Sequence, residues 1–356
     1  MNALFGSPLS SRRKAVQPTA VETSPGGSPA GAMDMTAVLR MMADDLARVE
    51  EQFERNLRSQ VDLITTVGRY VLTSGGKRIR PLLLLLSARL CGYRGERAVP
   101  LASIIEFIHT ATLLHDDVVD NAELRRGQRS ANTVWGNEAS VLVGDFLFSK
   151  SFSLMVADGD IRVLKAVSDA TTAMAEGEVL ELLKTCDLDV TPEEYLEVIE
   201  NKTAVLIAAA CEIGGILGGV DEERVRSLRA FGMDVGVAFQ LIDDCLDFVG
   251  DQARFGKPVG ADLEEGKITL PLIHALRTGT PEERDRVAEL VEKDALDDGD
   301  RSWVRDLVIR RGGIEAARRM ARERVARAKA SLGVFPPCQA RTALAVVADY
   351  VVDRDR

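Results

Sequence analysis

Two groups of three aspartates share the same spacing, and each group lies in an apolar stretch of the chain. The first group is Asp116, Asp117 and Asp120, and the second is Asp243, Asp244 and Asp247. On a helix, the first and last aspartates of a group lie one turn apart on the same face. Like charges at this spacing repel each other, so a bound cation would stabilise them.

One such group alone is equally well explained as a solvated acidic turn. The apolar flank FIHTATLLH before the first group, and the repeated spacing in QLIDDCLDF, argue against that explanation. Mg²⁺ prefers oxygen ligands and often completes its octahedron with water and substrate phosphates. The sequence therefore predicts two carboxylate groups that hold a diphosphate through Mg²⁺ ions, which make it a better leaving group.

Basic residues that could contact phosphate oxygens occur in several other segments. They are Lys77, Arg78 and Arg80 in GGKRIRP, Arg125 and Arg126, Lys202, Lys257 and Lys267. Arginine matches phosphate oxygens in pairs, whereas lysine acts as a point charge. Any one of them is most simply a surface cation, but together with two aspartate groups they favour a phosphate-binding site.

Helices must position these side chains, because apolar residues recur at helical spacing after residue 34. Residues 35–57 have one apolar face, whereas residues 98–120 are apolar nearly all round, as in a helix buried inside a bundle. Thr191 and Pro192, followed by two glutamates, form a helix-start signature. We expect an all-α fold with one large domain over residues 34–356. Residues 1–33, rich in Pro, Gly, Ser and Ala, are predicted to be a flexible tail.

The composition narrows the class of protein. Of the 356 residues, 46% are hydrophobic, and the formal net charge of -10 argues against a nucleic-acid partner. The five scattered cysteines are expected to be reduced, as in a reducing compartment. We find neither a secretory signal nor an uninterrupted apolar run of about 18 residues, and therefore expect a cytoplasmic protein.

Five motifs resemble, in order, those of the trans-isoprenyl (polyprenyl) diphosphate synthase family. They are GGKRIRP, LLHDDVVDNAELRRG, NKTA, QLIDDCLDF and FGKPVGADLEEGKITLPLI, which run from Gly75 to Ile273. The resemblance implies the isoprenoid synthase fold, a helical bundle around a central hydrophobic tunnel, and a homodimer. It also implies condensation of isopentenyl diphosphate onto an allylic diphosphate, such as farnesyl or geranylgeranyl diphosphate, with about three Mg²⁺ ions per active site.

The same resemblance assigns roles to individual residues. Mg²⁺ would be bound by Asp116, Asp117, Asp120, Asp243, Asp244 and Asp247. The allylic diphosphate would contact Arg125, Lys202 and Lys257. Isopentenyl diphosphate would be held by Lys77, Arg80, His109 and Arg126, although His109 by itself would be interpreted as a buried core histidine. Thr203 and Gln240 would face the reacting carbons and stabilise developing positive charge.

The residues just before the first aspartate group predict a long product. In this family the growing chain runs down a hydrophobic tunnel below that group, and side chains one turn upstream form its floor. Here these are Thr112 and Ala111, both small, with Ile108 and Phe107 another turn deeper. Because the missing floor adds at least one turn of about 5.4 Å, we expect about eight to ten isoprene units (C40–C50), as in quinone side chains. The stretch EFIHTATLLHDDVVD resembles the octaprenyl and decaprenyl enzymes. Alternatively, Phe107 closes the tunnel at a lower level and limits the product length.

Other interpretations of the same motifs remain open. A short-chain synthase (C15–C20), a non-catalytic subunit of a two-component synthase and a terpene cyclase are the alternatives, and the intact aspartates and basic residues argue against the last two. Glu181 stands where relatives often carry glutamine, and we expect it to lie away from the predicted ligands. A product this long is insoluble in water, which favours loose contact with the inner membrane surface.

Overall fold

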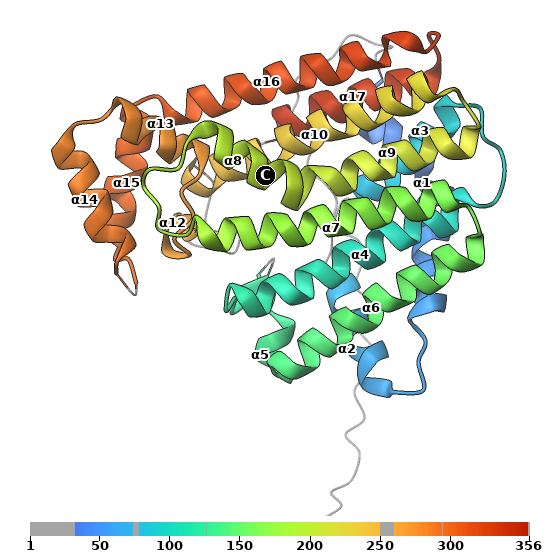
Figure 1. Ribbon diagram of the computed structural model, residues 1–356, viewed down its shortest axis with the longest axis horizontal. Coiled ribbons are helices and arrows are strands. Elements are labelled where there is room, and N and C mark those ends of the chain that lie inside the picture. Colours follow the sequence, from blue (N-terminus) through green and yellow to red (C-terminus); the bar gives the residue numbers. More distant parts are fainter. Residues whose placement is uncertain (1–32, 74–77, 126, 250–259, 294, 355–356) are drawn as a thin grey trace, which may run out of the picture. The chain divides into compact units, whose positions relative to one another are not determined.

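The computed structural model describes residues 33–73, 78–125, 127–249, 260–293 and 295–354, and all of these belong to one compact unit that begins at Met33. Figure 1 shows its elements. The first half contains α1 (Met35–Leu57), α2 (Asp62–Thr73), α3 (Ile79–Leu90), α4 (Ala98–Val119), β1 (Leu124–Arg125), β2 (Gln128–Arg129), α5 (Ala131–Trp135), α6 (Asn137–Asp158) and α7 (Ile161–Leu183). The second half contains α8 (Pro192–Ile199), η1 (Glu200–Ala204), α9 (Val205–Gly218), α10 (Glu222–Val249), α12 (Ala261–Glu264), α13 (Leu270–Thr278), α14 (Pro281–Val291), α15 (Asp298–Arg310), α16 (Gly313–Ser331), η2 (Leu332–Val334) and α17 (Gln339–Asp353).

Nearly all of this unit is helical, which confirms the predicted all-α class. The exception among the described residues is the short antiparallel hairpin β1–β2, in which Arg125 pairs with Gln128. The predicted helix start at Thr191 is also confirmed. Its hydroxyl accepts a hydrogen bond from the main-chain N–H of Glu194, whose side chain accepts one from the N–H of Thr191, so the two residues form a capping box.

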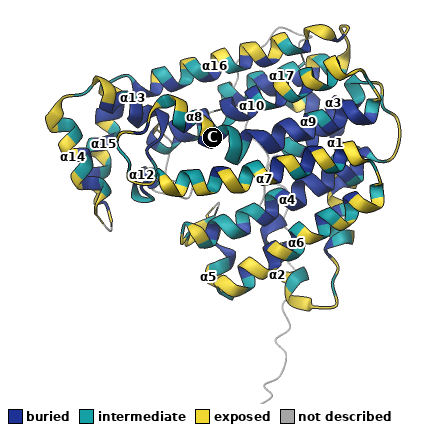
Figure 2. Ribbon diagram, viewed as in Figure 1, coloured by how far each residue is buried: buried dark blue, intermediate teal, exposed yellow. Residues whose placement is uncertain are grey.

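The centre of the bundle consists of helices that are apolar on nearly every side. Helix α9 is buried along almost its whole length and packs against α3, α7 and α10. In Figure 2 it is a dark band between helices with exposed faces. The outer helix α16, by contrast, buries one stripe of small apolar residues, including Ala317, Ala321 and Val325. Removal of this apolar surface from water is what holds the bundle together.

Two glycines allow neighbouring helices to approach the short π-helical segment η1. A Cβ atom on Gly177 of α7 would lie 2.7 Å from the main-chain nitrogen of Lys202, and one on Gly236 of α10 would lie 2.5 Å from Cα of Ala204. These distances are too short for real carbon atoms, so any larger residue would push the helices apart. The glycines therefore bring α7 and α10 against the segment that carries Lys202 and Thr203.

Within the described residues, three helical stretches are long and apolar enough to cross a membrane by length and composition alone: Ala98–Val119, Asn137–Asp158 and Pro192–Gly218. In the first and third, 72% of the apolar window is buried inside the protein, because these stretches form the centre of the bundle. In α6 only 33% is buried. Helix α6 therefore presents an apolar surface that this bundle does not cover.

Candidate active site

The first aspartate group lies at the end of α4 and presents two of its carboxylates to a polar pocket. Asp116 lies in the last turn of the helix, and Asp120 is its C-cap residue. Both line a pocket of about 190 Å³. His109 and Thr112 lie on the same face of α4 as Asp116, because residues three, four and seven apart share a helix face. The helical spacing thus places these side chains as a row.

Asp117 points toward a different partner. Its carboxylate is only 2% exposed and accepts a 2.6 Å hydrogen bond from Nε of Arg125. The side-chain amide of Asn132 donates to its main-chain oxygen at 2.9 Å. The ion pair holds Arg125 at the rim of the pocket, which Arg125 also lines. In this structure Asp117 orients Arg125 through one carboxylate oxygen, Oδ1, and its predicted role as a Mg²⁺ ligand stays a prediction.

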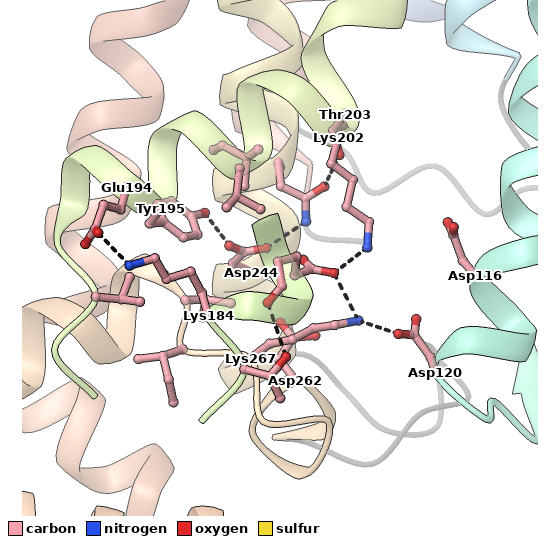
Figure 3. A pocket seen from close by; sticks show the side chains of 18 of the residues that line it. Asp116, Asp120, Lys184, Glu194, Tyr195, Lys202, Thr203, Asp244, Asp262 and Lys267 are labelled. Atoms are coloured by element: carbon pink, nitrogen blue, oxygen red, sulfur yellow. Dashed lines mark hydrogen bonds and ion pairs between the residues drawn. The ribbon is translucent and has the colours of Figure 1, made fainter. Parts of the chain in front are cut away.

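The π-helical segment η1 carries Lys202 and Thr203 on the side of the pocket opposite Asp116 (Figure 3). Nζ of Lys202 lies 2.9 Å from Glu178 and donates a hydrogen bond to Glu181. Burial by itself would lower the pKa of Lys202, but the surrounding carboxylates, Glu181 foremost, raise it above its ordinary value. Lys202 therefore remains a cation. Short π-helical segments of this kind often occur at functional sites.

The second aspartate group lies on α10, and Asp244 is its most buried member, at 2% exposure. It accepts hydrogen bonds from the hydroxyl of Tyr195 and, at 2.8 Å, from Nε2 of Gln240. The hydroxyl of Thr203 donates to Oε1 of Gln240 at 3.1 Å. Burial, and after it the charge of Asp262, raises the pKa of Asp244 well above its ordinary value. A hydrogen-bonded chain therefore links both predicted cation-stabilising residues to the second aspartate group.

Asp243, in the same group, pairs with the end of the chain. Nη2 of Arg354 lies 2.6 Å from Oδ1 of Asp243 and donates to the carbonyl oxygen of Phe239 at 2.7 Å. The guanidinium also lies 3.8 Å from the centre of the Phe239 ring, which is a favourable cation–π arrangement. Asp247 lies one turn further along α10. No motif in the sequence indicated Arg354, because it stands far along the chain from Asp243.

Lys267 follows α12 and lines the polar pocket, as Lys184 and Lys202 do. Its Nζ lies 2.7 Å from Glu265 and 3.2 Å from Asp120. Burial would lower the pKa of Lys267, but the nearby carboxylates, led by Glu181, raise it. Figure 3 shows the ammonium groups of Lys202 and Lys267 close to each other and facing α4. The pocket thus holds these two lysines, together with Lys184 and Arg125, among carboxylates from α4, α7 and α10.

The oxygen ligands in this pocket suit a hard divalent cation without forming a complete shell around one. Within the described part of the chain, no group of three or more His, Cys, Asp or Glu side chains lies close enough to hold a metal ion. Mg²⁺ at phosphate-binding sites commonly uses one or two carboxylates and takes its other ligands from water and phosphate oxygens. Asp116 and Asp120 on one side, and Asp244 on the other, fit that arrangement.

A larger and mainly apolar cavity, of about 650 Å³, adjoins the polar pocket at Asp116 and Lys202, which line both spaces. Thr112 of α4, Phe148 of α6 and Met174 of α7 line this cavity. A second cavity shares Phe148 with the first and continues along α7. A polar pocket above an apolar space suits a substrate that has an anionic head and a hydrocarbon chain.

The residues predicted to limit the product length are Phe107, Ile108, Ala111 and Thr112. Of these four, Thr112 is the one that appears among the described residues lining the cavity. Phe107 and Ala111 are fully buried in a separate core cluster, where Phe107 stacks on Phe53 at 4.1 Å. Ile108 belongs to the main core. In this structure Thr112 lines the cavity, whereas Ala111 does not, and the cavity is also lined by Phe148 and Met174, which the sequence motifs did not indicate.

Glu181 does not lie away from the predicted ligands, so that expectation is wrong. Its carboxylate accepts a hydrogen bond from Lys202, 21 residues further along the chain, and lies 3.9 Å from Nζ of Lys267. It also lines the polar pocket. The approach of α7 to η1 at Gly177 creates this contact, and sequence spacing gives no information about such an approach.

The predicted pocket for isopentenyl diphosphate stays a prediction. Lys77 and Arg126, together with Lys257 of the allylic site, lie outside the described residues. Arg80 lies in the first turn of α3, and His109 lies in α4 before Thr112; both are half-buried.

Divalent cations should stabilise the protein more at high pH than at low pH. Burial raises the pKa of Asp116 to about 7, with Lys202 opposing the shift. Because an unfolded aspartate titrates near 4, the protonated carboxyl favours the folded, metal-free protein at low pH, and this contribution is lost as the pH rises from about 4 to 7. A cation that pairs with ionised Asp116 compensates for the loss.

We therefore expect Mg²⁺ to raise the midpoint of thermal unfolding more at about pH 8 than at about pH 5.5. The difference should shrink in the Asp116→Asn variant, which has no charge to titrate. Equal Mg²⁺-induced shifts at both pH values in the wild type would contradict the expectation.

Comparison with known proteins identifies relatives over most of the chain. Residues 61–308 match the family model described as Polyprenyl synthetase. The chain is 44% identical over 328 residues to the octaprenyl diphosphate synthase of Escherichia coli, a match that covers 91% of this chain and 100% of that protein.

Solved structures share the fold. The polyprenyl synthase of Caulobacter crescentus CB15, crystallised with calcium and isoprenyl diphosphate, superimposes with a TM-score of 0.88 at 40% identity and covers 92% of this chain and 100% of that chain. A decaprenyl diphosphate synthase from Rhodobacter capsulatus gives a TM-score of 0.85 at 42% identity and covers 90% and 99%, respectively. These neighbours agree with the predicted isoprenoid synthase bundle.

Proposed function

This chain belongs to the polyprenyl synthetase family, and we propose that it is a long-chain trans-polyprenyl diphosphate synthase with a product in the octaprenyl to decaprenyl range. The observation that carries the proposal is the junction of the polar pocket and the apolar cavity at Asp116 and Lys202. A diphosphate bound at this junction has space for a hydrocarbon chain directly beneath it.

The substrates would be isopentenyl diphosphate and an allylic diphosphate such as farnesyl or geranylgeranyl diphosphate. Mg²⁺ ions, about three per active site, would be held by Asp116 and Asp120 on α4 and by Asp243 and Asp244 on α10, together with phosphate oxygens. The calcium and isoprenyl diphosphate bound in the Caulobacter structure support a divalent cation at such a site.

The mechanism would begin with loss of diphosphate from the allylic substrate. When bound, Mg²⁺ supplies charge neutralisation of the leaving diphosphate. Lys202, Lys267 and Arg125 line the same pocket and would add positive charge to the departing oxygens. These cations are fixed by ion pairs before the substrate arrives, so little reorganisation is needed at the moment of ionisation.

The allylic cation would then be attacked by the double bond of isopentenyl diphosphate, and a proton would be lost, most simply to the departing diphosphate. The Thr203 hydroxyl donates to Gln240, which in turn donates to Asp244. This direction of hydrogen bonding leaves the lone pairs of the Thr203 oxygen to face positive charge. No covalent intermediate with the enzyme is required, and the protein acts by positioning, electrostatics and exclusion of water.

Incubation with farnesyl diphosphate, labelled isopentenyl diphosphate and Mg²⁺, followed by chromatography of the products, tests the function. We expect the main product in the octaprenyl to decaprenyl range. Products that stop at the farnesyl or geranylgeranyl length would contradict the long-chain proposal and favour a short-chain synthase. If homogeneous protein formed no product, the proposal that this chain is active by itself would be contradicted. A subunit of a two-component synthase would then be favoured.

We also propose that the chain is a homodimer that buries the outer faces of α6 and α7. Leu142 and Val156 on α6, and Ile161 and Leu183 on α7, are each more than half exposed. Exposed apolar patches of this kind mark interaction surfaces. Sedimentation equilibrium should give twice the mass of one chain, and a monomeric mass at micromolar concentration would contradict the proposal.

The proposed location is the cytoplasm, with loose contact at the inner membrane surface through the insoluble product. Partition of the protein into lipid vesicles should then increase when the long-chain product is present and remain low without it.

A further inference from the structure

Helix α7 places one carboxylate between Lys202 and Lys267, two of the lysines that line the polar pocket. Nζ of Lys202 donates a hydrogen bond to Glu181, and Nζ of Lys267 lies 3.9 Å from Oε2 of the same carboxylate. Both ammonium groups therefore pair with the same oxygen atom of this carboxylate, Oε2. The side chains of Glu181, Lys202 and Lys267 are 23%, 20% and 18% exposed, so water screens their charges only in part.

Neither lysine depends on Glu181 for its position. Lys202 also contacts Glu178 at 2.9 Å. Lys267 also contacts Glu265 at 2.7 Å and Asp120 at 3.2 Å. These additional ion pairs would hold both ammonium groups in place if Glu181 were neutral. The main effect of Glu181 is therefore a negative charge at the point where the two lysines converge.

That point is where the proposed function places the diphosphate of the allylic substrate. In a partly buried pocket the effective dielectric constant is far below that of water, so a like charge a few ångströms away weakens binding of an anion appreciably. The same two lysines must release a diphosphate at the end of each reaction. A carboxylate that already neutralises part of their charge makes that release easier.

We propose, on the basis of the proposed function, that Glu181 is a counter-ion that weakens the hold of Lys202 and Lys267 on diphosphate and so sets the affinity of the allylic site for inorganic diphosphate and prenyl diphosphates. Glu181 then differs from the aspartates of the pocket, which would strengthen diphosphate binding through Mg²⁺.

The Glu181→Gln variant removes the charge and keeps the shape, and Glu222→Gln is its matched control. Glu222 lies in the first turn of α10 with 88% of its side chain exposed, and its replacement changes the net charge of the chain by the same amount. Binding of inorganic diphosphate would be measured by calorimetry in excess Mg²⁺. We expect about tenfold tighter binding for Glu181→Gln, an effect that weakens as salt increases, and no appreciable change for Glu222→Gln.

A second measurement uses inorganic diphosphate as an inhibitor that competes with the allylic substrate. Its inhibition constant should fall in Glu181→Gln by the factor that calorimetry gives. Unchanged binding in Glu181→Gln would overturn the inference, and weaker binding would show that Glu181 is a Mg²⁺ ligand or a positioning residue instead. In both cases the wild type still binds diphosphate, so the proposed function stands. A wild type that binds no diphosphate in the presence of Mg²⁺ would overturn the proposed function itself.

Discussion

Replacement of Asp116 by asparagine is expected to lower kcat for condensation about a thousandfold, which corresponds to about 4 kcal/mol of lost transition-state stabilisation. Asp116 lines both the polar pocket and the apolar cavity, so it lies where the bond between diphosphate and hydrocarbon would break. Asparagine preserves the shape of the side chain but lacks the charge that would hold a divalent cation against the leaving group. Steady-state rates with radiolabelled isopentenyl diphosphate, over a range of Mg²⁺ concentrations, measure the effect.

Asp169→Asn is a suitable control for Asp116→Asn. Asp169 is an exposed aspartate on α7 that pairs with Lys165 on the surface, and exposed pairs of this kind contribute little to stability. This variant should retain wild-type activity. If Asp116→Asn kept more than about a tenth of the wild-type rate, a loss of less than about 1.4 kcal/mol, Asp116 would not be essential for activation of the diphosphate.

The second large effect concerns the length of the product. A phenylalanine in place of Thr112 should shorten the main product to about C15–C20, because the aromatic ring would fill the cavity about one helical turn below Asp116. The Thr112 hydroxyl donates only to the main chain of its own helix, to the carbonyl oxygen of His109 at 2.9 Å. The substitution therefore breaks no hydrogen bond with another element. Chromatography of the products, with farnesyl diphosphate as the primer, measures the change.

Ala111→Phe is the informative comparison for Thr112→Phe. Ala111 is fully buried in the cluster that contains Phe53, Phe107 and Leu114, so a larger side chain there would overpack the core at a cost of about 1–3 kcal/mol. We expect Ala111→Phe to lower the midpoint of thermal unfolding and Thr112→Phe to leave it nearly unchanged. A full-length product from Thr112→Phe, or a shortened product from a stable Ala111→Phe, would reverse the assignment of the floor.

The sequence by itself determined the features that depend on neighbouring residues. Helical periodicity predicted the all-α fold, and the Thr191 signature predicted a helix start that the structure shows as a capping box. The spacing of the aspartates predicted that Asp116 and Asp120 share one helix face, and both indeed line one pocket. These predictions succeed because turns, caps and helix faces are fixed by interactions between residues a few positions apart.

The structure alone decided which distant residues meet. Helical periodicity separates Thr112 from Ala111, but only the packing of α6 and α7 shows that Thr112 faces the cavity while Ala111 faces the core. The pairing of Arg354 with Asp243 likewise joins the end of the chain to the second aspartate group. Such contacts depend on how whole helices pack against one another. The spacing of residues along the chain does not predict that packing.

Glu181 is the clearest example of a residue whose role the sequence did not predict and the tertiary structure decided. The sequence marked it as a departure from the family pattern but gave no reason to connect it with Lys202 and Lys267. That connection arises because Gly177 has no side chain, so α7 can lie against the main chain of Lys202. The sequence thus determined which chemical groups the protein has and on which helix face each one lies. The tertiary structure decided which of their charges act on one another, because electrostatic interaction depends on distance in space rather than along the chain.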